Sequence, residues 1–198
     1  MKTVNKSVLI WYSPEEMFAL VTDVASYPEF LPWCDHSTVL EQDAHGMKAE
    51  VGISLGGLRK SFVTRNTHEQ GRRVKMELVE GPFSKLDGDW HFHPVGDGTQ
   101  RACKVELQLH YGFDSRTLAA LVGPVFDRIA ATFVDAFIKR AEDRSKALHN
   151  FFVDCFDTGR KEGLIPPSFF VVFFKLHLLN TFQATYCFYL KILLFFEK

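Results

Sequence analysis

The stretch that most constrains the fold covers residues 114–149, where apolar residues recur at intervals of three and four. That spacing places them along one side of an α-helix, and charged residues such as Arg128 fall on the other side. Gly123-Pro124 interrupts the pattern, because proline has no N–H to donate and crowds the preceding turn. We therefore expect a short helix, a kink, and a long helix over residues 125–144. An apolar stripe of this width requires a large apolar surface to lie on.

Before residue 114, short runs of alternating apolar and polar residues indicate the strands of an antiparallel sheet. A first strand is expected over residues 3–12. Two short helices should follow it, one capped by Ser13 and one within residues 26–34. Six more strands are expected, at residues 37–42, 47–55, 58–67, 73–80, 86–94 and 99–113. Because the sheet's apolar face and the helical stripe are complementary, we expect an α+β helix-grip architecture, in which a curved antiparallel sheet wraps around a long C-terminal helix.

The composition argues against several classes of protein. A net charge of −1 on 198 residues gives no overall attraction for DNA or anionic lipid. The four cysteines form no CxxC pair, which favours free thiols in a reducing compartment. No presequence pattern precedes the first strand, so we expect a cytoplasmic, bacterial protein. His91 and His93 lack a third ligand at matching spacing, and no nucleophile or cofactor fingerprint is evident, so we expect no metal, no cofactor and no catalysis.

Basic residues gather in one predicted hairpin, over residues 58–80. Charges of this kind contact phosphates without reading base sequence, so the hairpin could bind an RNA surface or anionic lipid headgroups. The alternative is an ordinary solvated hairpin whose charges discourage aggregation. The six residues that would form the patch are Arg59, Lys60, Arg65, Arg72, Arg73 and Lys75.

Four separated motifs resemble one known family. They are SYPEFLPWC at residues 26–34, KSFVTRN at 60–66, EGPFSKLDGDWHF at 80–92 and GPVFDRIAATFVDAFIKRA at 123–141. Together they resemble the START-like (SRPBCC-like) family over residues 1–147, in the branch shared by coenzyme Q-binding proteins and bacterial ribosome-association toxins. The resemblance implies a helix-grip fold with an apolar cavity. It also implies either a ubiquinone-type ligand that supports respiration, or binding to the large ribosomal subunit that blocks subunit association.

A cavity between sheet and helix would suit an isoprenoid quinone, because ligand pockets are largely apolar with a few polar anchors. An empty void of about 400 Å³ would cost nearly 10 kcal/mol, which favours a ligand in a void of that size. For any one candidate residue a packed core is the simpler interpretation, whereas the group favours a pocket. We therefore expect a ubiquinone carrier, peripheral at the inner membrane, with ribosome binding as the alternative. The candidate lining residues are Phe30, Leu31, Trp33, Phe62, Met76, Phe83, Trp90, Phe92, Val125, Phe126, Ile129 and Phe133.

Residues 148–198 lie outside the resemblance and form a hydrophobic C-terminal extension that we expect to be poorly ordered. Eleven of the chain's 20 Phe lie beyond residue 150, but no run reaches the length of a membrane span. Three interpretations remain: an interfacial membrane anchor, a partner-binding extension, or a C-terminus produced by a shifted reading frame. The last is favoured, because the helix caps and periodicity seen upstream are missing.

Overall fold

The computed structural model describes residues 1–55 and 57–161. Within them, seven strands form one antiparallel sheet in the spatial order β1-β7-β6-β5-β4-β3-β2, so β1 and β2 are the edge strands. Within the described residues, one strand precedes the short helices and six follow them, as expected from the sequence. The strands are β1 (Lys2–Ile10), β2 (Cys34–Asp43), β3 (Gly46–Leu55), β4 (Leu58–Glu69), β5 (Arg73–Glu80), β6 (Phe83–Pro94) and β7 (Cys103–Phe113).

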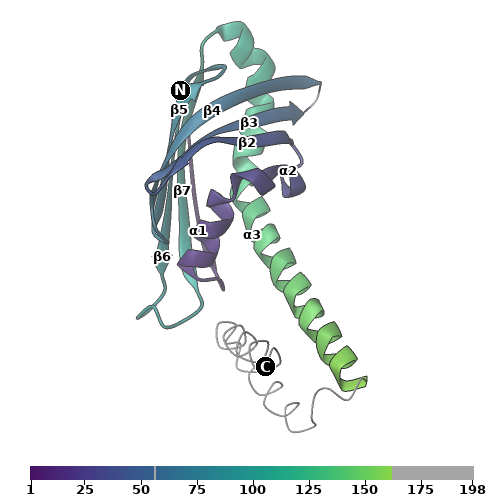
Figure 1. Ribbon diagram of the computed structural model, residues 1–198. Coiled ribbons are helices and arrows are strands. Elements are labelled where there is room, and N and C mark those ends of the chain that lie inside the picture. The colour runs from purple at the N-terminus through teal and green to yellow at the C-terminus, as the bar shows by residue number, and fades with distance from the viewer. Residues whose placement is uncertain (56, 162–198) are drawn as a thin grey trace. The chain divides into compact units, whose positions relative to one another are not determined.

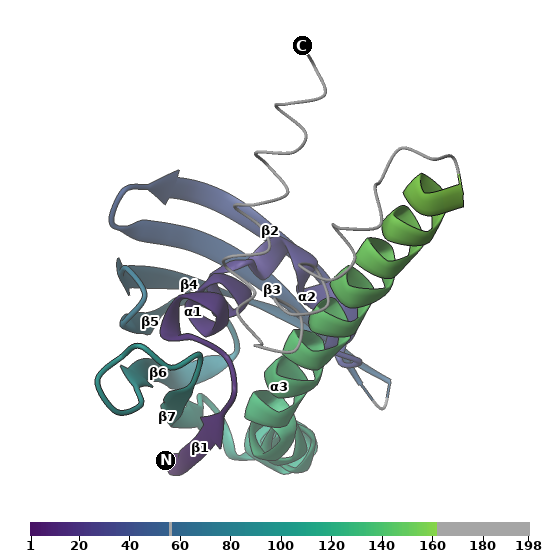
Figure 2. The ribbon, with the colours of Figure 1, turned by 90° about the horizontal axis from the view of Figure 1, so that it is seen from below.

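One face of the sheet is apolar because inward and outward residues alternate along each strand. In β7, Cys103, Val105, Leu107, Leu109 and Tyr111 are all buried, and the residues between them are exposed or half-buried. The sheet curves, and the helices lie on its concave side (Figures 1 and 2). The expected α+β helix-grip architecture is therefore confirmed.

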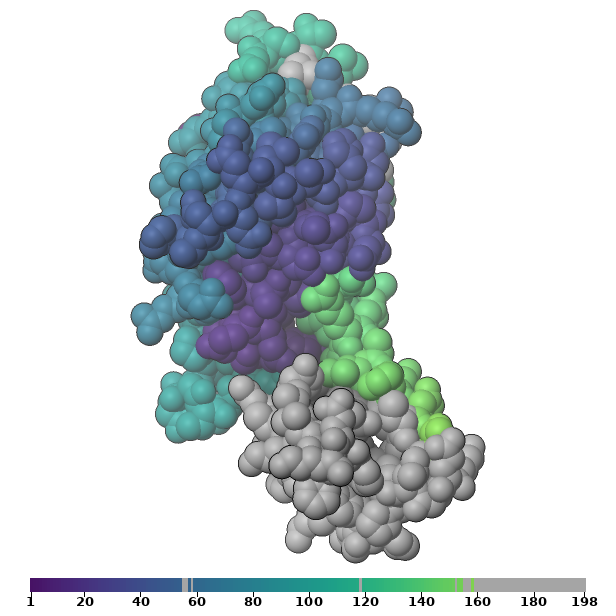
Figure 3. All heavy atoms as spheres, in the orientation of Figure 1, coloured from purple at the N-terminus to yellow at the C-terminus, as the bar shows by residue number. Residues whose placement is uncertain are grey.

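Three short helical segments connect β1 to β2: α1 (Pro14–Thr22), η1 (Val24–Ser26) and α2 (Tyr27–Phe30). The expected cap starts α1, since the Ser13 hydroxyl accepts from the Glu16 N–H at 3.2 Å and the Glu16 carboxylate accepts from the Ser13 N–H at 2.7 Å. The Tyr27 hydroxyl donates to the Val21 carbonyl at 2.6 Å and ties α2 to α1. In the space-filling view these segments and β2, in purple and dark blue, form a nearly continuous layer (Figure 3).

The long helix α3 (Arg116–Lys161) differs from expectation at both ends. Pro124 lies inside one helix instead of separating two, and the ribbon bends near its start (Figure 1). A proline interrupts a single hydrogen bond, so neighbouring turns can continue the helix through a bend. The helix also passes the expected end at residue 144, because no further Pro or Gly occurs before Gly159.

Hydrogen bonds and ion pairs hold α3 against the rest of the domain. Near its start, Asp127 accepts from the Tyr111 hydroxyl and from Lys2, both at 2.5 Å. Further along, Arg144 donates to Asp23 at 2.7 Å, and Arg140 pairs with Glu29 of α2. These contacts fix the helix at two places along its length.

The structure divides into Met1–Arg144 and Ser145–Lys198. The division lies close to residue 147, where the resemblance ends. Of the second unit only the end of α3 is described, so residues 148–161 are helical where we expected poor order. The expected apolar segment from residue 164 onward lies outside the described residues. No helix within residues 1–55 and 57–161 has both the length and the apolarity needed to cross a bilayer.

Candidate functional site

A cavity of about 50 Å³ lies between the inner face of the sheet and α3. Strands β3 to β7 form one wall, and the segment around Val24 and Trp33 and one side of α3 form the others. The residues that line it are Val24, Tyr27, Trp33, Val51, Phe62, Thr64, Asn66, Met76, Leu86, Leu109, Phe126, Ile129, Ala130 and Phe133.

Aromatic side chains fill most of the space on either side of this cavity. Toward the start of α3, the ring of Phe83 lies 5.6 Å from that of Phe62 and 5.0 Å from that of Phe126, centroid to centroid. On the other side, the ring of Phe133 lies 5.8 Å from that of Trp33 and 5.2 Å from that of Phe137. Rings in edge-to-face contact of this kind pack like any dense protein core.

The small volume changes the energetic argument for a ligand. At about 24 cal/mol per Å³, an empty cavity of the observed size costs only about 1 kcal/mol, not the ~10 kcal/mol of the void considered from the sequence. A cavity that binds benzene measures about 150 Å³. A quinone ring therefore enters this cavity only if the lining side chains move, and the fold does not need a ligand to be stable.

Six of the twelve residues proposed from the sequence line the cavity, and the other six do not. Those on the cavity wall are Trp33, Phe62, Met76, Phe126, Ile129 and Phe133. The remaining residues belong to the surrounding core or pack against it, and they are Phe30, Leu31, Phe83, Trp90, Phe92 and Val125.

Two polar residues of the cavity, Thr64 and Asn66, escaped the sequence analysis. They are 4% and 5% exposed and are the buried polar side chains of the described core. The Asn66 Oδ1 atom accepts no hydrogen bond from the described residues. Their positions in the sequence could have revealed them. Thr64 lies two residues and Asn66 four residues after Phe62 on β4, so all three side chains point to the same face of the sheet.

The structure divides the six basic residues of the hairpin β4–β5 into two groups. Ion pairs hold Arg65, Arg73 and Lys75 on the outer face of the sheet. Arg65 lies 3.2 Å from Asp43, and Lys75 lies 2.9 Å from Glu77. These three cations are therefore largely neutralised by their neighbours and offer little net charge to a phosphate.

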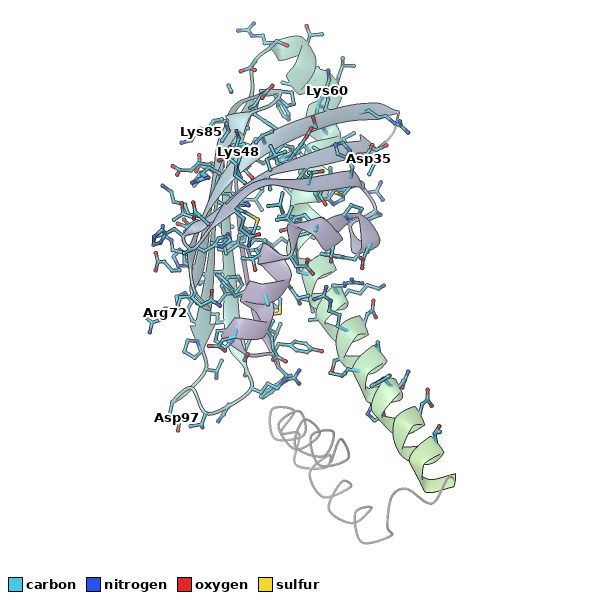
Figure 4. The ribbon with its side chains drawn as sticks, viewed as in Figure 1. Asp35, Lys48, Lys60, Arg72, Lys85 and Asp97 are labelled. Carbon is cyan, nitrogen blue, oxygen red and sulfur yellow. The ribbon has the colours of Figure 1, made fainter. Side chains whose placement is uncertain are left out.

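For Arg59, Lys60 and Arg72, all exposed, we find no ion pair with any described residue. Figure 4 shows Lys60 and Arg72 at opposite ends of the hairpin. Nine residues of extended strand separate Lys60 from the end of β4, which corresponds to roughly 30 Å. The six residues thus do not form one compact patch. They provide two separate basic points, Arg59 with Lys60 at one end and Arg72 at the other.

The pair between Arg73 and Asp89 supplies a testable pH dependence. Arg73 donates to both carboxylate oxygens, at 2.8 Å and 2.6 Å. These hydrogen bonds hold the pKa of Asp89 below its ordinary 3.8. A carboxyl whose pKa is lowered by folding stabilises the folded state above its ordinary pKa, and this contribution is lost as the pH falls through the folded value.

Asp89→Asn is therefore expected to lower the free energy of unfolding by about 1 kcal/mol at neutral pH, since the pair is partly exposed to solvent. The difference from the unmodified protein should shrink steadily below about pH 4. Urea unfolding over a pH series measures it, with the exposed Asp135→Asn as control. A difference that stays constant down to the lowest pH would contradict the assignment.

The described residues offer weak support for catalysis. Burial raises the pKa of the Cys34 thiol to about 11 and that of Cys103 to about 12, so neither is an activated nucleophile. His91 and His93 stack with ring centroids 5.8 Å apart, and each contacts one carboxylate. Across the described part of the chain, no three His, Cys, Asp or Glu residues gather as a metal site.

Comparison with known proteins places this chain in a family. Residues 10–138 match the family described as polyketide cyclase/dehydrase and lipid transport. The chain is 44% identical to the ribosome association toxin RatA of Vibrio cholerae, over 72% of this chain and 96% of that protein. It is 41% identical to RatA of Escherichia coli K12, over 72% and 89% respectively. The chain therefore belongs to the START-like polyketide cyclase/dehydrase and lipid transport family, and the RatA proteins are among its relatives.

More distant relatives share the fold. The mitochondrial coenzyme Q-binding protein COQ10 of Drosophila melanogaster is 27% identical over 71% of this chain and 59% of its own length. An 18 kDa protein from Caulobacter crescentus has a TM-score of 0.58 at 29% identity, covering 74% of this chain and 99% of that one. A Streptomyces aromatase/cyclase has a TM-score of 0.64 at 14% identity, covering 73% and 95%. At that identity the likeness concerns the fold alone.

Proposed function

We propose that this protein associates with the ribosome as RatA-type proteins are named for doing, by binding the large subunit and hindering its association with the small subunit. The observation that carries the proposal is the identity of 41–44% over nearly the full length of the RatA relatives. From the sequence, the resemblance left the two functions open, and the expected apolar cavity favoured ubiquinone binding. The comparisons favour the alternative, because the coenzyme Q-binding relative is only 27% identical.

The exposed side chains are compatible with an RNA partner. Arg59, Lys60 and Arg72 carry charge that no described neighbour neutralises, and phosphate contacts by such cations need no base specificity. This function requires binding and no reaction, so we propose that the protein is not an enzyme. It would act in the cytoplasm, where its partner is assembled.

Co-sedimentation tests this proposal. The full chain is centrifuged through sucrose with purified large subunits, with purified small subunits, and alone. We expect it to pellet with large subunits only, and to be released as the salt concentration rises, because phosphate contacts release counterions. Recovery of the protein in the supernatant at low salt, with large subunits present, would refute the proposal.

A second candidate function, the binding of a lipophilic ring compound, is favoured by the polar residues within the cavity. Thr64 and Asn66 interrupt an otherwise apolar wall, which is the arrangement of a ligand pocket. The candidate ranks below ribosome association because the cavity of about 50 Å³ must widen before a ring can enter. Ubiquinone or a similar isoprenoid lipid is the ligand class that the coenzyme Q-binding relative suggests.

A further inference from the structure

We propose that Asn66 and Thr64 form a hydrogen-bonding site that makes the cavity select a hydroquinone over the corresponding quinone. The inference rests on the second candidate function, lipid binding, and is independent of ribosome association. Asn66 determines which redox form of the head group the cavity prefers.

Both polar side chains are buried in the wall of the cavity. Among the described residues, Thr64 and Asn66 are the polar residues that are buried as whole side chains, at 4% and 5% exposed, and both line the cavity. Alternation along β4 directs both side chains to the same side, about 7 Å apart along the strand. An amide and a hydroxyl placed side by side in an otherwise apolar chamber are the few convergent polar groups that mark a ligand site.

The amide oxygen of Asn66 lacks a hydrogen-bond donor among the described residues. Asn66 Oδ1 is buried and accepts no hydrogen bond from the described residues, which costs folding free energy. Leucine has a similar size and would avoid that cost, so the amide at this position lowers the stability of the fold. A group of this kind is explained by a partner that enters from outside the chain.

Hydrogen-bond chemistry then identifies the ligand class. A carboxamide oxygen accepts and does not donate, so only an O–H or N–H group of a ligand can supply the hydrogen bond that Asn66 Oδ1 lacks, whereas the amide nitrogen can donate to an oxygen of either form. The carbonyl and ether oxygens of a quinone only accept, whereas each hydroxyl of a hydroquinone donates. The Thr64 hydroxyl can donate or accept, so it tolerates both forms. The apolar remainder of the wall, including Leu109 and Ile129, suits the ring and its alkyl chain.

Room for the ring comes from Met76, which lines the cavity beside Asn66 in the β4–β5 register. Its side chain occupies the space above Gly88, where an added Cβ would lie 2.4 Å from the Met76 methyl carbon. Methionine is unbranched and changes rotamer at low cost. Water is the competing occupant, since 50 Å³ is enough for a few molecules that could donate to Asn66.

Anaerobic calorimetric titration of the full chain with decyl-substituted hydroquinone and with the matching quinone tests the inference. We expect the hydroquinone to bind about fivefold more tightly, the effect of one additional neutral hydrogen bond. Asn66→Leu should remove the preference by weakening hydroquinone binding more than quinone binding, and it should raise the melting temperature. Asn5→Leu, on the exposed face of β1, is the matched control and should leave the preference unchanged.

The outcomes separate this inference from the function on which it rests. Equal binding of the two forms by the unmodified protein overturns the selectivity and leaves lipid binding intact. Binding of neither form overturns both, with water as the occupant of the cavity. A lower melting temperature of Asn66→Leu with an unchanged preference also overturns the inference, because the amide is then structural. If that variant does not fold, the ratio of the two affinities measured for the unmodified protein still decides between these outcomes.

Discussion

Replacing Phe137 by alanine is expected to lower the free energy of unfolding by about 3–5 kcal/mol, the range for a large ring removed from a packed core. Phe137 is fully buried. Its ring centroid lies 5.4 Å from that of Tyr27, 5.2 Å from that of Phe30 and 5.5 Å from that of Trp90. It therefore joins α3 to α2 and to the sheet at once. A typical domain is stable by ~5–15 kcal/mol, so this one change should remove a large part of the total.

Urea unfolding followed by circular dichroism measures the effect. The control is Leu121→Ala on the same helix, where the side chain is 71% exposed and its removal should change stability by about 0.5 kcal/mol or less. Similar midpoints for the two variants would show that α3 is not gripped by the sheet through this residue. The packing described for the helix would then be wrong.

The second large effect concerns ribosome binding. The triple variant Arg59→Glu/Lys60→Glu/Arg72→Glu reverses the three hairpin charges that have no ion-pair partner among the described residues. We expect it to bind large subunits more weakly by on the order of tenfold or more near physiological salt. Up to three phosphate contacts are lost, so the plot of log affinity against log salt should also become shallower. Filter binding or sedimentation over a salt series gives both quantities.

A charge-matched control separates local contacts from net charge. Arg116→Glu/Arg128→Glu/Lys146→Glu changes the same number of exposed cations on α3, and we expect its affinity to stay within about threefold of the unmodified protein. Equal loss in the two triple variants would mean that overall charge governs the interaction. Unchanged binding by the hairpin variant would remove the hairpin from the interface.

Much of the fold could be predicted from the sequence because local rules agree with the tertiary structure. The expected bounds of β5, residues 73–80, match the structure, since turn residues enclose an alternating run. The capping box at Ser13 and the face of β7 were also evident from residue order alone. Each of these features depends on neighbours within a few positions of the chain.

The properties of the site depend on contacts between distant residues and could not be predicted in the same way. The size of the cavity depends on how the rings of Phe62, Phe83 and Phe126 interdigitate, and spacing along the chain does not determine that. The neutralisation of Arg65 and Arg73 depends on which carboxylates the strand register brings alongside. Asn66 could not be predicted as a cavity residue, because polar residues along an antiparallel strand ordinarily mark its solvent face.

Light scattering during subunit joining tests the central claim most directly. Purified large and small ribosomal subunits are mixed with magnesium in the presence of increasing amounts of the full chain, with the hairpin triple variant as a matched comparison. Ribosome association of the proposed kind predicts that the joined fraction falls as the protein approaches equimolarity with large subunits, and that the variant requires a much higher concentration. Undiminished joining at a large molar excess of the unmodified protein would contradict the claim.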